Sequence, residues 1–190
     1  AMRSEPMQAP CGEMVVNLAQ ELRSNQPLLT AIAGPAVTLS LVMRGGEGAI
    51  AMTREDLSRI LMNLTRNAVE AMSGGGGLEI ALEEADGRLS LTFRDTGPGI
   101  TPEAMERIFH PGYTTHLPGF EAADGRSAGA RDAGCTEGDR WPVQHRGLGL
   151  AIVRSLVSAA RGEVWAANRE DACGAVFTIE FPLRKKRGAG

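Results

Sequence analysis

The chain has 190 residues, 43% of them hydrophobic, and a formal net charge of −3. This size and composition are sufficient for one hydrophobic core, and we expect a single domain. No stretch approaches the roughly 20 consecutive apolar residues of a membrane-spanning helix, and the N-terminus lacks the pattern of a signal peptide, so we expect a cytoplasmic location. The small negative charge provides no broad attraction to nucleic acid, and we expect no nucleic-acid partner.

Cysteine and lysine usage excludes several kinds of site. The three cysteines, Cys11, Cys135 and Cys173, are far apart and lack the paired spacing of a zinc site or a disulfide framework. The only lysines are Lys185 and Lys186, close to the C-terminus. A P-loop needs a lysine directly after its glycine loop, and a Ser/Thr/Tyr protein kinase needs one on an early strand. Both architectures are therefore excluded.

The first third of the chain alternates between helix and strand patterns. Apolar residues in 13–29 recur at helical spacing, and residues 36–43 alternate as in a strand. Thr53 stands three residues before Asp56, which is a helix-start signal, and a long apolar stripe follows it. This second helix is expected to stop at Ser73 and the four glycines after it.

The middle of the chain predicts a hairpin and then a short helix. Two alternating runs, 78–83 and 89–94, are joined by Asp86–Gly87, a dipeptide typical of two-residue hairpin turns. Thr101 followed by Pro102 is a cap followed by a favourable first helical residue, so we expect a helix as far as about Phe109.

The last part of the chain contains a long stretch without periodicity. Residues 111–146 are rich in small and charged residues and far exceed the usual ~4–6-residue connection, so this loop is either functional or disordered. Helical spacing returns in 147–161, and two alternating runs, 163–167 and 175–181, predict a second hairpin. Helices and mostly antiparallel strands in this order predict an α+β fold, a two-layer α/β sandwich with helices on one face of the sheet.

A polar edge accompanies the apolar stripe of the second predicted helix. Asn63, Asn67 and Glu70 lie at i, i+4 and i+7, so they share one edge of the helix. An amide oxygen is a suitable ligand for Mg²⁺, which keeps waters and phosphate oxygens in the rest of its coordination shell, and Asn67 is a candidate for this role. Ordinary polar helix surface is the alternative reading of these residues.

Asp95 ends an apolar strand where the chain turns sharply. A buried carboxylate at this point needs a donor, which the exocyclic amine of adenine would supply, and Gly97 and Gly99 would let the backbone approach a flat base closely. A simple turn explains the same residues. Further along, Arg146, Gly147 and Gly149 stand at a helix start, where free N–H groups and the helix dipole favour phosphate.

Taken together, these segments resemble the catalytic domain of bacterial sensor histidine kinases. Residues 63–71 (NLTRNAVEA) resemble the N box of that family, 95–100 (DTGPGI) the G1 box, 108–115 (IFHPGYTT) the F box and 147–150 (GLGL) the G2 box. The resemblance covers residues from about 15 to 183 and is greatest to the nitrogen- and oxygen-sensing type. It implies the Bergerat ATP-binding fold over 13–183, with 111–146 as an extended ATP lid.

The resemblance also implies a role for individual residues. It implies that Asn67 binds Mg²⁺ and that Asp95 binds adenine, with Gly97 and Gly99 on either side of the base. It also implies that Thr178 adds a hydroxyl beside Asp95. The expected catalytic residues are Asn63, Asn67 and Glu70. The expected nucleotide contacts are Asn67, Asp95, Gly97, Gly99, Ile100, Phe109, Thr114, Thr115, Arg146, Gly147, Leu148, Gly149, Leu150 and Thr178.

The reaction expected from this resemblance is transfer of the γ-phosphoryl group of Mg-ATP to a histidine. Relatives that hydrolyse ATP carry a glutamate where this chain has Asn63, and a neutral amide is unable to act as a general base. The alternatives are an ATP-driven conformational ATPase, with Glu70 as a substitute base, and an anti-sigma-type serine kinase or binding module.

The acceptor histidine is expected to lie outside this chain. His110, His116 and His145 lie in or beside the predicted lid, not on an amphipathic helix. We therefore expect the partners to be the phosphoacceptor and dimerisation helices of the same full-length kinase and, indirectly, a response regulator, with the chain itself monomeric. Residues 1–12 are expected to be a disordered segment or linker, and 184–190 a solvated basic tail.

The sequence departs from the family pattern at the phosphate end of the site. His145 stands where the G2 box usually begins with glycine, and His116 stands where lysine commonly follows the threonine pair. The loop between them is longer than the lids of this subtype and contains Trp141. These changes point to weaker nucleotide binding than in typical members.

Overall fold

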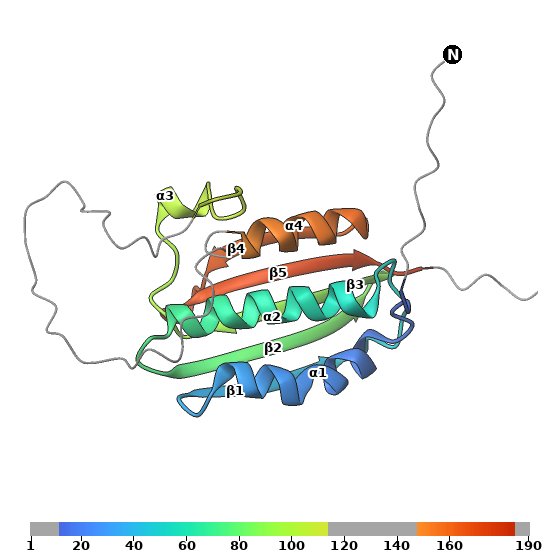
Figure 1. Cartoon of the computed structure of the whole chain (residues 1–190), viewed down its shortest axis with the longest axis horizontal. Helices are drawn as coiled ribbons and strands as arrows, with labels where there is room; N and C mark the ends of the chain where they lie inside the picture. Colours follow the sequence, from blue (N-terminus) through green and yellow to red (C-terminus); the bar gives the residue numbers. More distant parts are fainter. Residues whose placement is uncertain (1–11, 114–147, 185–190) are drawn as a thin grey trace, which may run out of the picture.

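Four helices and five strands are present in residues 12–113 and 148–184, the part of the chain that the computed structural model describes. In chain order they are α1 (Leu18–Ala33), β1 (Val37–Arg44), α2 (Arg54–Ala71), β2 (Gly76–Ala85), β3 (Arg88–Asp95), α3 (Pro102–Met105), α4 (Gly149–Ala159), β4 (Glu163–Asn168) and β5 (Ala175–Pro182). The strands form one sheet in the order β1-β2-β3-β5-β4 (Figure 1).

Side-chain caps determine where the two long helices begin. The Asn17 side chain accepts a hydrogen bond from Gln20 N at 2.9 Å, so α1 begins at Leu18 and not at the predicted residue 13. The residues before the cap are extended, and Val15 N donates to the carbonyl of Met52 at 2.9 Å. At α2 the predicted cap is confirmed, since Thr53 Oγ1 accepts from Asp56 N at 3.1 Å.

The glycines after α2 do not all belong to a loop. Gly76 and Gly77 form the start of β2 and pair with Val37 and Thr38 of β1. A Cβ at Gly76 would lie 2.5 Å from Thr96 Oγ1 and 2.7 Å from the sulfur of Met72, so a larger residue here would require these side chains to move. The chain therefore returns to the sheet two residues earlier than the sequence pattern indicated.

The sheet is mixed, with one parallel pair. β1 and β2 are parallel, as expected for strands joined through a crossing helix, and the other three neighbouring pairs are antiparallel. Asp86 and Gly87 both have positive φ, 51° and 74°, which is the geometry of a type I′ hairpin turn. The predicted hairpin at this position is confirmed.

The two faces of the sheet have different surroundings. Helices α1, α2 and α4 cover one face and enclose the core (Figure 1). In β3 the alternate residues Leu89, Leu91, Phe93 and Asp95 are buried on that side. The opposite face carries cross-strand ion pairs, including Arg94–Glu79 at 3.3 Å. The predicted two-layer sandwich with helices on one face is confirmed.

The short helix after the Asp95 turn is shorter than predicted. Thr101 caps α3 by accepting from Ala104 N at 3.3 Å, but regular helix ends at Met105. Turns continue from there, and Phe109 packs edge-to-face against Phe177 of β5, with ring centroids 6.5 Å apart. This contact attaches the end of the segment to the sheet.

Several predictions concern residues that the structure does not describe. Most of the predicted lid lies outside the described residues, and so do Trp141, His116 and His145. Of the predicted N-terminal segment and basic tail, only Gly12 and Arg184 are described, and Arg184 N donates to the carbonyl of Ala49 at 2.9 Å. None of the described helices has the length and apolarity that a bilayer crossing requires.

Candidate functional site

One side of helix α2 brings the predicted site segments together. Asn63, Asn67 and Ala71 are four residues apart, so they share one side of the helix. A Cβ at Gly149, the first residue of α4, would lie 3.0 Å from Asn63 Oδ1. A Cβ at Gly97 would lie 3.3 Å from the Cβ of Ala71. The start of α4 and the turn after β3 therefore lie one helical turn to either side of Asn67.

The three predicted polar residues of α2 have different surroundings. The Asn63 amide donates to the backbone carbonyl of Arg59 at 2.8 Å, which fixes the orientation of this side chain. Asn67 is half-buried, and its side chain makes no hydrogen bond to the residues that the structure describes. Glu70 is exposed to solvent.

Asp95 is a buried carboxylate held by backbone N–H groups. Only 2% of its surface is exposed. Its Oδ1 accepts from Gly97 N at 2.9 Å and from Ala175 N at 3.1 Å, so the carboxylate connects its own turn to the start of β5. In the described part of the chain both hydrogen bonds to this carboxylate are made by Oδ1. Oδ2 accepts no hydrogen bond from these described residues.

The turn after Asp95 depends on two glycines for different reasons. Gly97 is buried, and a Cβ there would lie 3.0 Å from Asp95 Oδ1. Gly99 has a φ of +84°, a conformation that residues with side chains rarely adopt. The turn therefore presents backbone without side chains next to the buried carboxylate.

The connection between β4 and β5 contacts this turn directly. The sequence analysis did not predict this contact. A Cβ at Gly174 would lie 2.0 Å from the backbone oxygen of Asp95, so the two backbones are in direct contact. Arg169 pairs with Asp171 at 2.8 Å. The hydrogen bond from Arg169 holds the pKa of the Asp171 carboxyl below its ordinary value. Arg169 Nη1 also donates to the backbone carbonyl of Asp95 at 3.5 Å, so the connection contacts the Asp95 turn through this side chain as well.

Residues 52–185 match the sequence profile of a family described as histidine kinase-, DNA gyrase B-, and HSP90-like ATPases. This match covers more than half of the chain. The chain belongs to this family. The resemblance seen in the sequence is therefore confirmed at the level of the family, whereas the nitrogen- and oxygen-sensing type stays a prediction.

Individual histidine kinases of this family show similarity over most of the chain. The signal transduction histidine-protein kinase BaeS of Escherichia coli K12 is 29% identical over 132 residues, which are 70% of this chain and 24% of BaeS. The two-component sensor PprA of Pseudomonas aeruginosa is 31% identical over 163 residues, 82% of this chain and 14% of PprA. The chain thus spans about a quarter or less of the length of these relatives.

A solved structure agrees with the fold. Full-length ShkA in complex with AMPPNP superimposes with a TM-score of 0.66 and 26% sequence identity, covering 94% of this chain and 33% of ShkA. The predicted α+β sandwich of the histidine kinase-, gyrase B- and HSP90-like family is therefore confirmed both by the strand order and by this similarity.

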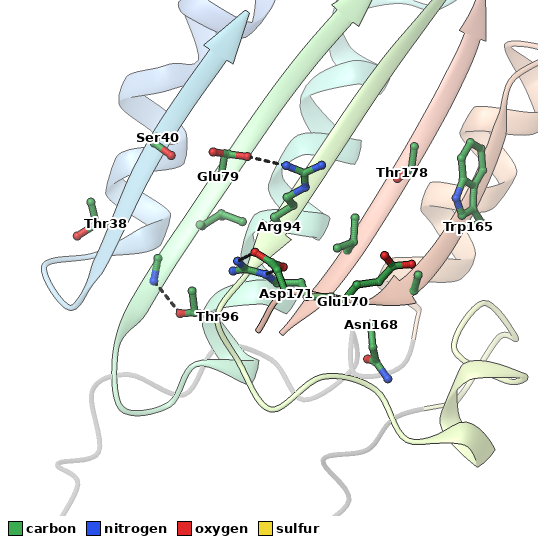
Figure 2. Close-up of a pocket in the computed structure, with 15 residues that line it drawn as sticks. Thr38, Ser40, Glu79, Arg94, Thr96, Trp165, Asn168, Glu170, Asp171 and Thr178 are labelled. Atoms are coloured by element: carbon green, nitrogen blue, oxygen red, sulfur yellow. Dashed lines mark hydrogen bonds and ion pairs between the residues drawn. The ribbon is translucent and has the colours of Figure 1, made fainter. Parts of the chain in front are cut away.

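One site residue expected from the family resemblance is misplaced. Thr178 does not lie beside Asp95, because it pairs with Thr92 in the sheet and faces the side opposite to the helices. Figure 2 shows Thr178 on this open face with Arg94 and Trp165, whereas Asp95 is buried on the helix side. Side chains of residues that pair across adjacent strands point to the same face of the sheet, and the face alternates along each strand. Thr178 therefore shares the face of Thr92, which is opposite to the face of Asp95.

The remaining family positions are placed only in part. Ile100, Phe109 and Leu150 are partly buried and pack against the core near the site, while Leu148 is 38% exposed at the start of α4. Four predicted contacts lie outside the described residues: Thr114, Thr115, Arg146 and Gly147. Their roles stay predictions.

The expected Mg²⁺ would need oxygen ligands. The described residues contain no cluster of three or more His, Cys, Asp or Glu side chains that would hold a metal by themselves. Mg²⁺ commonly uses one or two protein oxygens together with waters and substrate phosphates, so a single amide oxygen between two backbone turns fits it. Asn67 is in that position.

Proposed function

We propose that this domain binds Mg-ATP and transfers the γ-phosphoryl group to a histidine on a separate dimerisation and phosphoacceptor domain of a two-component sensor kinase. The observation that carries the proposal is the convergence at α2 of the Asp95 turn and the first turn of α4, with Asn67 between them. The family match and the similarity to the histidine kinase BaeS and the two-component sensor PprA support it.

The base of the nucleotide is assigned to the Asp95 turn. Asp95 Oδ1 is engaged by Gly97 N and Ala175 N, so Oδ2 is assigned as acceptor for the exocyclic amine of adenine. Gly97 and Gly99 keep side chains away from the ring. A guanine base has a carbonyl oxygen at the position of that amine, and a buried carboxylate would repel it.

The phosphates are assigned to the Asn63 end of this side of α2, where α4 begins. The first backbone N–H groups of a helix have no partner within the helix, and the N-cap residue of α4, Leu148, provides no side-chain acceptor for them. These donors and the helix dipole suit phosphate oxygens. Mg²⁺, when bound, would neutralise phosphate charge, with Asn67 as its protein ligand.

Asn63 favours transfer over hydrolysis. Its amide nitrogen already donates to the carbonyl of Arg59, and an amide does not accept a proton from water at neutral pH. In this arrangement the chain binds and orients ATP, and the nucleophile is supplied by the acceptor histidine. Positioning then accounts for most of what this domain contributes to the reaction.

The decisive experiment is a calorimetric titration with a non-hydrolysable ATP analogue, with and without Mg²⁺. We expect Mg²⁺ to increase the affinity, and Asn67→Ala to abolish that increase. Gln26→Ala, which removes an exposed amide from α1, serves as the control and should leave the increase unchanged. Equal affinity with and without Mg²⁺ in the unsubstituted chain would contradict the assignment of Asn67.

A second variant tests the base pocket. Asp95→Asn retains an oxygen for Gly97 N and Ala175 N but places an amide NH₂ group, a donor, where Oδ2 stands. The fold should therefore persist, while the contact to the exocyclic amine of adenine is lost. A hydrogen bond to a charged group contributes about 1.5–3 kcal/mol, which corresponds to a loss of roughly 10- to 150-fold in affinity. An unchanged dissociation constant for Asp95→Asn would overturn the adenine assignment.

Phosphate release separates this proposal from an ATP-driven conformational ATPase. The chain alone should release inorganic phosphate from Mg-ATP at close to the background rate, because no acceptor histidine is provided and Asn63 is not a base. Rapid release that Glu70→Ala abolishes would favour the ATPase instead.

A further inference from the structure

Asn168, the last residue of β4, makes a reciprocal pair of hydrogen bonds to the Asp95 turn. Ile100 N donates to Asn168 Oδ1 at 2.7 Å, and Asn168 Nδ2 donates to the carbonyl of Ile100 at 2.8 Å. One side-chain amide thus satisfies both backbone groups of a residue 68 positions away in the sequence. Figure 2 shows Asn168 at the end of its strand, next to the segment that leads to α3.

The same amide explains why residue 99 is a glycine. Gly99 has a φ of +84°, and a Cβ there would lie 2.8 Å from Asn168 Oδ1. The amide therefore occupies the space that a side chain at 99 would need. Gly99 and Asn168 fit together as one contact between the turn and the β4–β5 connection.

The turn is consequently fixed at both ends. At its start, Asp95 Oδ1 accepts from Gly97 N and Ala175 N. At its end, Ile100 is held by Asn168. Gly97 and Gly99, which have no side chains to anchor them, lie between these two points. Without the second anchor, the glycine segment would have to be ordered when a ligand binds, and that ordering reduces affinity.

We infer that Asn168 is a positioning residue that holds the Gly99–Ile100 backbone in place for the purine base. This inference rests on the proposed function, because it concerns the base end of the same nucleotide site. It assigns to Asn168 an effect on binding of the base and none on binding of the phosphates, which are assigned to the start of α4.

The test compares three ligands in the whole chain, each with Mg²⁺: a non-hydrolysable ATP analogue, the corresponding GTP analogue and inorganic tripolyphosphate. We expect Asn168→Ala to weaken binding of the ATP analogue about tenfold, which is the effect of losing one or two net hydrogen bonds. Tripolyphosphate, which has no base, should bind Asn168→Ala and the unsubstituted chain equally. The preference for the ATP analogue over the GTP analogue should fall in parallel.

Asn25→Ala is the matched control. Asn25 also bridges two elements, since its Nδ2 donates to the carbonyl of Glu21 at 2.8 Å and its Oδ1 accepts from Ser58 Oγ at 2.9 Å. It connects α1 to α2, away from the Asp95 turn. Its removal should lower the melting temperature without changing the ATP-to-GTP preference.

The outcomes separate this inference from the proposed function. If the unsubstituted chain does not bind the ATP analogue, both fail. If it binds and Asn168→Ala binds with unchanged affinity and preference, or loses tripolyphosphate binding equally, only the positioning role is overturned. Should Asn168→Ala fail to fold, Asn168→Asp provides the same test, because it keeps the acceptor for Ile100 N and replaces the donor by a carboxylate oxygen that repels the Ile100 carbonyl. Its affinity for tripolyphosphate controls for the added charge.

Discussion

At the scale of single residues, Gly174 shows how closely the site depends on backbone contact. Its φ is +138°, and a Cβ at this position would lie 2.0 Å from the backbone oxygen of Asp95. That oxygen is unable to move alone, because Asp95 Oδ1 also accepts from Ala175 N, the next residue after Gly174. A side chain here would therefore push β5 and the Asp95 turn apart.

We predict that Gly174→Ala destabilises the fold by about 3 kcal/mol or more, since backbone strain is added to a clash that only backbone movement relieves. The control is Gly87→Ala in the β2–β3 turn, where φ is also positive at +74° but no atom lies within 4 Å of the new Cβ. This change should cost only about 1–2 kcal/mol. Urea denaturation measures both, and equal losses would contradict the role assigned to Gly174.

Local patterns in the sequence are sufficient to single out Asp95, Gly97 and Asn67 as candidates, because a strand that ends in a carboxylate and a polar helix edge can be recognised without the tertiary structure. Asn168 and Gly174 were missed because they act across the contact between two hairpins, which no local pattern specifies. Thr178 was misplaced because the facing of β5 depends on its register with β3, in which Thr178 pairs with Thr92.

At the scale of elements, helix ends show where local patterns suffice and where they do not. Val15 is fully buried and stands at helical spacing from Leu18 and Leu22, yet it lies in an extended segment before the helix. The spacing of buried residues is therefore consistent with a helix that includes Val15, and only the Asn17 cap shows that α1 begins at Leu18. For α2 the cap and the apolar stripe begin together, so its start was predicted correctly.

We predict that Thr53→Ala, which removes the cap of α2, lowers the free energy of unfolding by about 1.5 kcal/mol, within the usual range of ~0.5–2 kcal/mol. Its hydroxyl also donates to Asp56 Oδ2 at 2.8 Å, and Thr53 is only 5% exposed, which places the effect in the upper half of that range. Thr30→Ala, at an exposed position of α1, is the control and should change stability by less than about 0.5 kcal/mol. Thermal unfolding of the two variants checks the difference, and similar melting temperatures would argue against the cap.

At the scale of the whole molecule, the two faces of the sheet contribute unequally to stability. On the helix side Phe93 is 1% exposed and pairs across the strands with Ile80 and Phe177. On the open side the next residue, Arg94, pairs with Glu79 while 53% of its side chain remains exposed. Solvent weakens the attraction between exposed charges, so such an ion pair contributes little to stability. Apolar side chains packed in the core are shielded from solvent and contribute more.

Adjacent substitutions on β3 separate these two contributions. We predict that Phe93→Ala lowers the free energy of unfolding by about 3–5 kcal/mol, because it leaves a cavity between the sheet and the helices. Arg94→Gln, one residue along the same strand, should cost less than about 1 kcal/mol, and its effect should vanish at high salt. Equilibrium denaturation at two salt concentrations measures both values. Comparable losses would mean that the ion pairs of the open face stabilise the sheet as much as the core does, contrary to the one-sided arrangement of helices on this sheet.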